Sequence, residues 1–401
     1  MSSPLDELDP RARRIVDLAA DLARRLAPGE IEADRTSQFP LAHYDLLHEA
    51  GYLRLGIPRE HGGEGASVLE LVLAQEQLAH AGAALGISAG MLFNVVGKLT
   101  TSTTWPRELA AYMLGKIARE GGLANMVVTE PELGSISRGG VPATTAEPVA
   151  GGFVVNGHKV FVTAAPGLRF LLTLVRLPPT AAAPTGSTAV AVVEAPAKGL
   201  RIESTWRDSL SQRSGGNDDV YYENVFVPDA FVVERTPIGQ PPLAAGPGAH
   251  WLAMVAVYLG VGQAALDAAI TYAHQRVPSV LGQPLASVEP TQRLIGEAHV
   301  TLSAARALLY AAAERCSKPG VAAAEVGAHV AGAKYTVTHA ACHATELALR
   351  VAGGFGLTSR LTLERHFRDA RGGLFQALQD DLALRLLGRH VLDAHAPAPN
   401  D

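Results

Sequence analysis

The stretch MVVTEPELGS, residues 126–135, marks the point at which this chain changes from helices to strands. Val127, Val128 and Thr129 favour a strand, Pro131 ends it, and Gly134-Ser135 predicts a turn. Such a strand end can present backbone N–H groups and a threonine hydroxyl to a planar ligand with polar edges, and Ser135 can donate to an anionic group. Taken alone, the stretch is more typical of an ordinary strand and turn.

Hydrophobic periodicity divides the chain into three blocks around this stretch. Residues 123–238 contain short runs of strand-forming residues and predict a small antiparallel β domain. Within GGFVVNGHKVFVTAA (151–165), apolar residues alternate on both sides of Asn156-Gly157, a pattern typical of a two-residue hairpin.

The two flanking blocks, residues 1–122 and 239–401, have helical periodicity. Four long helices rich in Ala and Leu are expected in the second of them, at 251–276, 289–316, 322–351 and 378–393. The expected fold class is therefore α+β and mainly α, with an N-terminal helical domain, a middle antiparallel β domain and a C-terminal four-helix bundle.

The bulk composition narrows the possible functions. A chain of 401 residues exceeds the ~250–300 residues that one core can serve. Thirty-four Lys and Arg against 39 Asp and Glu give a net charge of −5, so a nucleic-acid partner is not expected. The N-terminus, MSSPLDELDPRARR, has no apolar run, and no stretch reaches the ~18–20 apolar residues of a membrane span. We expect a cytoplasmic protein without a membrane span.

Neither a nicotinamide nor a metal site is expected. The closest approach to a dinucleotide-binding Gly motif, residues 260–265, lies inside a predicted helix rather than between a strand and a helix. His339, Cys342 and His343 share one helix face at metal-ligand spacing, but only Glu346 could complete the set on an otherwise apolar helix. Cys316 and Cys342 are the two cysteines, too few for a disulfide framework.

Five segments, taken together and in this order, resemble acyl-CoA dehydrogenases. TEPELGS matches the family's flavin-binding TEPxxGS, and NGHKVFVTAA resembles its NGxKxWITNA. VYYENVFVPDAFVV resembles the strand that closes the β domain, and GVGQAALDAAITYAHQR the first long helix of the bundle. RVAGGFGLTSRLTLERHFRDAR resembles the family's QxxGGxGYxxxxxxERxxRDAR.

The resemblance implies three domains, 1–122, 123–238 and 239–401, with FAD bound between the β domain and the bundle. Phe161 would replace the family's Trp against the flavin ring, Arg276 would contact the pyrophosphate, and Ser135 would also contact the substrate. Gly353-Gly354 would let a second subunit approach the adenine end, so a homodimer or homotetramer is expected. The residues that the resemblance assigns to the cofactor are Met126, Val128, Thr129, Gly134, Ser135, Phe161, Val162, Thr163, Arg276, Arg350, Gly353 and Gly354.

The sequence departs from the family pattern at three places. The segment after Arg276 is two residues longer than the family's Arg-x-x-Phe-Gly, and Arg350 replaces a Gln. The catalytic Glu that removes the α-proton of an acyl thioester is also missing. Its usual position falls on Ala377, or on Leu378 with one gap, and its alternative position falls on His250.

Three residues are candidates for a substitute base. Asp380 and Asp381 lie close in sequence to the expected position, although an acid pair is also typical of a helix N-terminus. His250 is a candidate because a histidine can titrate near neutral pH, although a histidine at a helix start is often only structural.

The first hypothesis for function is an FAD-dependent oxidoreductase that acts on the Cα–Cβ bond of an acyl thioester, most simply an acyl-CoA, or of a related carbon acid. The second is a flavin-dependent monooxygenase, or a redox-neutral lyase, on the same fold. The third is a non-catalytic protein that binds flavin or CoA esters.

Overall fold

The computed structural model describes residues 8–133, 140–240, 248–318 and 320–395. In the N-terminal part, local caps define where helices begin. The carboxylate of Asp9 accepts hydrogen bonds from the N–H groups of Arg11 and Ala12, and Ser67 with Glu70 forms a capping box. The helices of this part are α1 (Pro10–Thr36), α2 (Leu41–Glu49), α3 (Val68–Leu78), α4 (Ala83–Thr101) and α5 (Arg107–Glu120).

An eight-stranded sheet forms the middle of the molecule, in the order β6-β7-β3-β2-β4-β5-β8, with β1 added beside β4. Its neighbouring strands are antiparallel except that β1 and β2 both run parallel to β4. The strands are β1 (Leu123–Val127), β2 (Thr145–Val149), β3 (Gly152–Val162), β4 (Leu168–Leu177), β5 (Ser187–Glu194), β6 (Leu200–Glu203), β7 (Asp218–Pro228) and β8 (Val232–Pro237).

The hairpin predicted at Asn156-Gly157 is wrong. Strand β3 continues through both residues, and its pairing with β7 shifts register between Val155 and Gly157. A Cβ atom at position 157 would lie 2.4 Å from Thr144 Oγ1, so glycine is needed there for close packing rather than for a turn. The strands β2 and β3 are instead joined at Gly151, which has a φ of 81°.

The C-terminal part consists of long helices, as expected, with one addition. Helix α9 was not predicted, because its apolar positions are interrupted by the charged residues of the ERHFRDAR segment. Arg276 follows the last residue of α6 and caps it. The helices are α6 (Trp251–Gln275), α7 (Glu289–Cys316), α8 (Ala323–Ala352), α9 (Leu363–Phe375) and α10 (Asp380–Ala394).

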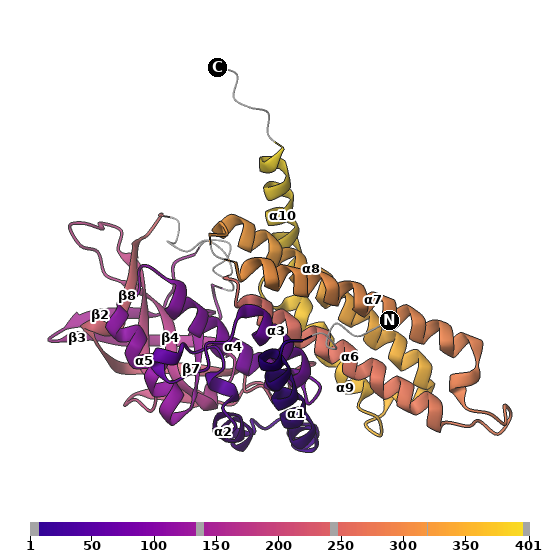
Figure 1. The fold of residues 1–401 in the computed structure, drawn as a ribbon. Coiled ribbons are helices and arrows are strands. Elements are labelled where there is room, and N and C mark those ends of the chain that lie inside the picture. The colour runs from indigo at the N-terminus through magenta and orange to yellow at the C-terminus, as the bar shows by residue number, and fades with distance from the viewer. Residues whose placement is uncertain (1–7, 134–139, 241–247, 319, 396–401) are drawn as a thin grey trace.

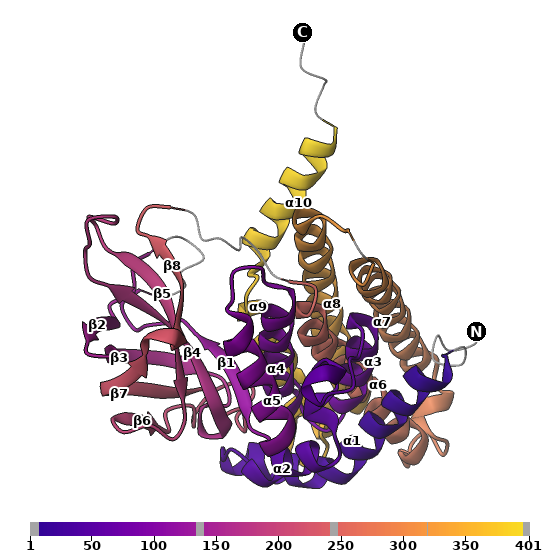
Figure 2. The same cartoon turned by 60° about the vertical axis from the view of Figure 1, so that its left-hand side comes forward.

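Figures 1 and 2 show the sheet on one side of the molecule, the long C-terminal helices on the other, and α4 with α5 between them. One apolar core joins the N-terminal helices to the sheet, and a second joins α3 and α4 to α6, α7 and α8. Two described helices, α4 and α6, are apolar and long enough to cross a membrane, but 78% and 72% of their apolar windows are buried inside the protein. Core packing therefore accounts for their composition. Helix α10 projects away from the body in both views.

Candidate functional site

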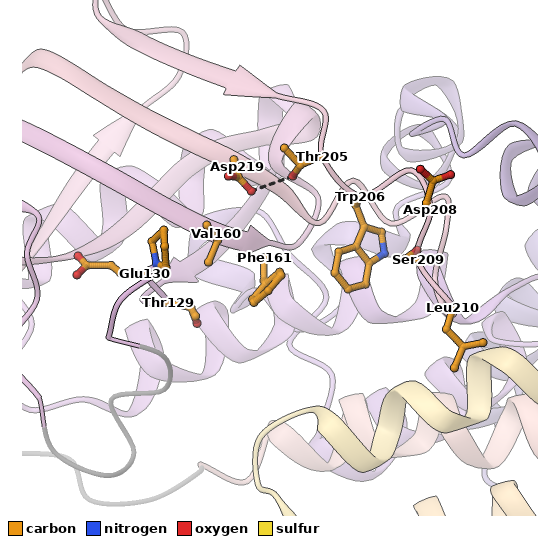
Figure 3. A pocket seen from close by; sticks show the side chains of 11 residues that line it. Thr129, Glu130, Val160, Phe161, Thr205, Trp206, Asp208, Ser209, Leu210 and Asp219 are labelled. Atoms are coloured by element: carbon orange, nitrogen blue, oxygen red, sulfur yellow. Dashed lines mark hydrogen bonds between the residues drawn. The ribbon is translucent and has the colours of Figure 1, made fainter.

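A cavity of about 610 Å³ opens where β1 ends against the edge of the sheet. Figure 3 shows that Thr129, Phe161 and Trp206 project to the same side of the β domain, and that Leu210 extends toward a C-terminal helix. The volume lies within the ~300–1,000 Å³ that is usual for cofactor sites. The residues that line it are Thr129, Glu130, Pro131, Val160, Phe161, Thr205, Trp206, Asp208, Ser209, Leu210 and Asp219.

The strand end beside the cavity is fixed by a buried ion pair. Lys159 Nζ lies 2.7 Å from Glu130 Oε1 and 3.2 Å from the carbonyl oxygen of Val128, and both charged side chains are almost completely buried. Glu130 also accepts from the backbone N–H groups of Ala143 and Thr144 and from the Thr144 hydroxyl. Burial would raise the pKa of Glu130, but the hydrogen bonds from Lys159 and Thr144 outweigh burial and hold it below its ordinary value.

This ion pair joins the two sequence segments that line the cavity. The N–H of Val160 donates to the carbonyl oxygen of Thr129 at 3.0 Å, so the strand end and β3 lie side by side. Thr129 and Phe161, both predicted cofactor contacts, therefore reach the same cavity.

An aromatic corner forms one side of the cavity. The ring of Phe161 meets the ring of Trp206 edge to face, with centroids 5.8 Å apart and planes at 78°. Phe161 is 62% exposed and has a φ of 57°, a left-handed conformation that costs energy for a bulky residue. An exposed aromatic ring in such a conformation is typical of a surface that stacks on a planar ligand.

The other predicted contacts near the cavity lie behind this surface. Val162 and Thr163 are buried, and the carbonyl oxygen of Thr163 accepts from the side chain of Asn125. Met126 is partly buried against the core that contains the sheet. Gly134 and Ser135 lie outside the described residues.

The predicted pyrophosphate and adenine contacts lie together at a different place. The guanidinium of Arg276 lies over the ring of Phe355, 5.4 Å from its centroid, and Arg350 is paired with Glu346. A Cβ atom at Gly353 or Gly354 would meet nothing within 4 Å, so this surface is open.

Helix α6 separates these residues from the cavity side of the molecule. It begins against α4, which also packs on β1, and its 25 residues extend roughly 37 Å to Arg276. One chain therefore does not bring both groups of predicted contacts to one small-molecule site.

Neither position at which the family's catalytic glutamate is expected carries a carboxylate. Ala377 is exposed and Leu378 is buried. Asp380 starts α10 but is already paired, with Oδ1 3.2 Å from Lys334 Nζ and Oδ2 2.7 Å from His339 Nε2. Burial raises the pKa of Asp380 less than these two partners lower it, so the carboxylate stays ionised and engaged. Asp381 lies beside it in the first turn of α10 and is exposed.

His250, unlike Asp380, has no polar partner among the described residues. It precedes α6, and no hydrogen bond to its ring nitrogens is found among the described residues. Burial lowers the pKa of His250 to about 4, so the imidazole is neutral near pH 7. A Cβ atom at Gly97 of α4 would lie 2.4 Å from the ring, so a glycine there makes room for the histidine.

A second unpaired polar group lies on the same face of α4. Gly90 and Gly97 both pack against α6, and Asn94 lies between them at helical spacing. The Nδ2 atom of Asn94 is buried and has no hydrogen-bond partner within the part of the chain that the structure describes. Buried donors without partners are rare, and they are typical of places where a ligand or water completes the bonding.

Several of these residues were not predicted from the sequence. Charged residues within apolar strands, Glu130 and Lys159, could have indicated a buried pair, and Asn94 could have been noticed within an apolar helix. Trp206, Leu210 and Asp219 gave no comparable signal.

The three residues considered as metal ligands have separate partners. His339 contacts Asp380, His343 contacts Glu297, and Cys342 Sγ lies 3.4 Å from the carbonyl oxygen of Ala370. No three His, Cys, Asp or Glu side chains are placed to share a metal ion in the described part of the chain.

Comparisons with known proteins cover almost the whole chain. Three family models match: the acyl-CoA dehydrogenase N-terminal domain over residues 9–119, the middle domain over 125–225 and the C-terminal domain over 251–392. The putative acyl-CoA dehydrogenase YdbM of Bacillus subtilis is 32% identical over 363 residues, which cover 90% of this chain and 92% of YdbM.

Solved structures support the same fold at lower identity. Butyryl-CoA dehydrogenase from Megasphaera elsdenii aligns with a TM-score of 0.83 and 21% identity, covering 98% of this chain and 100% of that one. FMN-bound TdsC from Paenibacillus sp. A11-2 aligns with a TM-score of 0.83 and 22% identity, covering 96% and 99%. The matching domain models and the identity to YdbM show that this chain belongs to the acyl-CoA dehydrogenase superfamily.

Proposed function

We propose that this protein is an FAD-dependent oxidoreductase that oxidises an acyl thioester, most simply an acyl-CoA, or a related carbon acid at the Cα–Cβ bond. The observation that supports it best is the cavity at the end of β1, where Thr129 and the exposed ring of Phe161 face the same space. A cavity with one stacking face and one hydroxyl fits the planar, polar-edged flavin ring. When bound, the flavin supplies a two-electron acceptor for the hydride that leaves Cβ.

The residues of this chain would then bind and position the cofactor. Phe161 and Trp206 would hold the ring, and the Glu130–Lys159 pair would keep Thr129 in place beside it. Arg276, Arg350 and Gly353-Gly354 would serve the cofactor of a second copy, since they lie at the far end of α6 and α8. We therefore propose that the protein assembles as a homodimer or homotetramer. We also propose that it is cytoplasmic.

Among the three candidate bases, His250 is the one we favour. Its ring nitrogens make no hydrogen bond among the described residues, whereas Asp380 would first have to leave Lys334 and His339. A pKa of about 4 keeps the imidazole neutral and able to accept the α-proton, although it makes His250 a weak base. Asp381 is the remaining candidate.

An anaerobic titration tests this proposal directly. The purified protein with its flavin is mixed with acyl-CoA esters of different chain length and branching, and the flavin absorption band is followed. Bleaching by at least one ester supports dehydrogenation. Protein that carries and takes up no flavin in either redox state contradicts the proposal as a whole.

A flavin-dependent monooxygenase is the second candidate, with a redox-neutral lyase as its alternative on the same fold. The absence of a carboxylate at Ala377 and Leu378 favours the monooxygenase, which does not need a base for the α-proton. Binding of only reduced flavin, with O₂ consumption when a reductase is supplied, would support the monooxygenase. Tight binding of CoA esters without bleaching or turnover would instead support a non-catalytic role.

A further inference from the structure

The loop between β6 and β7, residues 204–217, forms the wall of the cavity opposite Thr129. It contributes Trp206 and Leu210 to the lining, and Figure 3 shows both side chains on the cavity side. We call this segment the wall loop. Because it has no regular secondary structure of its own over most of its length, its position depends on its anchors.

One set of anchors belongs to the β domain. Asp218 Oδ1 accepts from the N–H groups of Thr205 and Trp206 at 3.0 and 3.2 Å, and Asp219 Oδ1 accepts from the Thr205 hydroxyl at 2.8 Å. These bonds hold the beginning of the wall loop. At its very end, the N–H groups of Ala164 and Ala165 donate to the carbonyl oxygens of Gly215 and Gly216 at 2.9 and 3.0 Å.

The start of the far half, residues 210–212, is held by helix α9. Asp369 Oδ1 accepts from the N–H of Gln212 at 2.8 Å, and the carbonyl oxygen of Asp369 accepts from the Ser211 hydroxyl at 3.4 Å. Arg368 Nη1 donates to the carbonyl oxygen of Leu210 at 3.1 Å. The side chain of Trp206 is tied to the same half, because its Nε1 donates to the carbonyl oxygen of Ser211 at 3.1 Å.

Gly372 permits this close contact. A Cβ atom at position 372 would lie 2.5 Å from Gln212 Nε2 and 2.6 Å from Ser211 Oγ. Glycine within a helix usually weakens it, so its presence in α9 is explained by the wall loop that lies against it.

Asp369 itself is fully buried, and burial raises its pKa to about 6. Arg365 and Arg368 from α9 partly offset that effect, while Asp34 from α1 adds to it. Either form of the carboxyl group can accept from the N–H of Gln212, so the anchor does not require a charge.

We propose that Arg368, Asp369 and Gly372 are positioning residues, which set the aromatic wall of the cavity from outside it. The inference rests on the proposed function for the identity of the ligand, a flavin. Arg368 and Asp369 belong to the segment that resembles the family's RDAR motif, whereas Trp206 and Leu210 lie outside the five quoted segments.

Four variants of the full-length protein test the proposal. Asp369→Ala removes the acceptor for Gln212, and Asp369→Asn keeps one. Gly372→Leu fills the contact with the wall loop, and Gly296→Leu makes the same change in α7, where a Cβ atom would meet nothing within 4 Å. Each variant is titrated with FAD, and folding is checked by circular dichroism. The emission of Trp206, obtained by subtracting a Trp206→Phe background, reports the position of the wall.

Asp369→Ala and Gly372→Leu are expected to raise the Kd for FAD about tenfold, the loss of one well-placed aromatic contact, and to shift Trp206 emission to longer wavelength. Asp369→Asn and Gly296→Leu are expected to match the wild type. Unchanged Kd and emission in folded Asp369→Ala and Gly372→Leu would overturn the proposal. If the wild type binds no flavin, the proposed function fails, and Trp206 emission alone then decides whether α9 positions the wall.

Discussion

The Glu130–Lys159 ion pair and the two residues Asn94 and His250 are polar groups next to apolar helices and strands, but their hydrogen bonding is opposite. Glu130 accepts four hydrogen bonds, from Lys159, Ala143 and twice from Thr144. Among the described residues, neither the amide nitrogen of Asn94 nor the ring of His250 has a hydrogen-bond partner. Saturated polar groups hold the fold, whereas unsaturated ones cost stability unless a ligand completes them. The comparison therefore separates a structural ion pair, Glu130 and Lys159, from two candidate functional groups, Asn94 and His250.

The largest expected effect is on stability, from breaking the saturated pair. Lys159→Met leaves the buried Glu130 carboxylate without its counter-ion and should lower the free energy of unfolding by about 3–5 kcal/mol. Chemical denaturation followed by circular dichroism measures it, with the exposed Lys198→Met as the control. A loss equal to that of the control would contradict the structural role given to the pair.

The next effect concerns the role of His250 as the base in catalysis. His250→Gln should lower kcat/KM by about 10²–10⁴, the usual contribution of a general base, while the Kd for FAD stays unchanged. Asp380→Asn should change kcat/KM little, because that carboxylate is paired with Lys334 and His339. The reverse result would assign the proton transfer to Asp380.

Removing the unpaired donor should stabilise the protein. Asn94→Leu replaces a buried amide without a partner by an apolar side chain of similar size, and we expect the free energy of unfolding to rise by about 1–3 kcal/mol. The same variant should raise KM for the substrate, if the amide binds it. A decrease in stability would show that Asn94 has a partner in the free protein.

The smallest effect is on the pH dependence of stability. Since the pKa of His250 is lowered to about 4, the unfolded chain takes up a proton below the ordinary pKa while the folded chain does not. Stability is therefore lost as the pH falls from about 6.5 toward 4, by at most about 2 kcal/mol at pH 5. Comparing Tm at pH 7.5 and pH 5 for the wild type and His250→Gln isolates this contribution, which should be absent in the variant.

Local features of the sequence were enough to predict the order of the helical, strand and helical blocks, although not every element within them. Periodicity and capping act over a few residues, so the change from helices to strands near residue 123 and back near 251 is visible without the structure. The family resemblance, rather than any local pattern, pointed to Thr129 and Phe161, which both line the cavity. Asn156-Gly157 was misjudged because the contact that requires glycine comes from Thr144, on another strand.

The amino-acid sequence by itself determined the three blocks, the family and the absence of a carboxylate at residues 377 and 378. Only the tertiary structure decided that Glu130 pairs with Lys159, that Asp380 is engaged while His250 is not, and that α9 supports the wall loop. These contacts join residues between 29 and 158 positions apart. They depend on how the elements pack, and no local pattern in the chain specifies that.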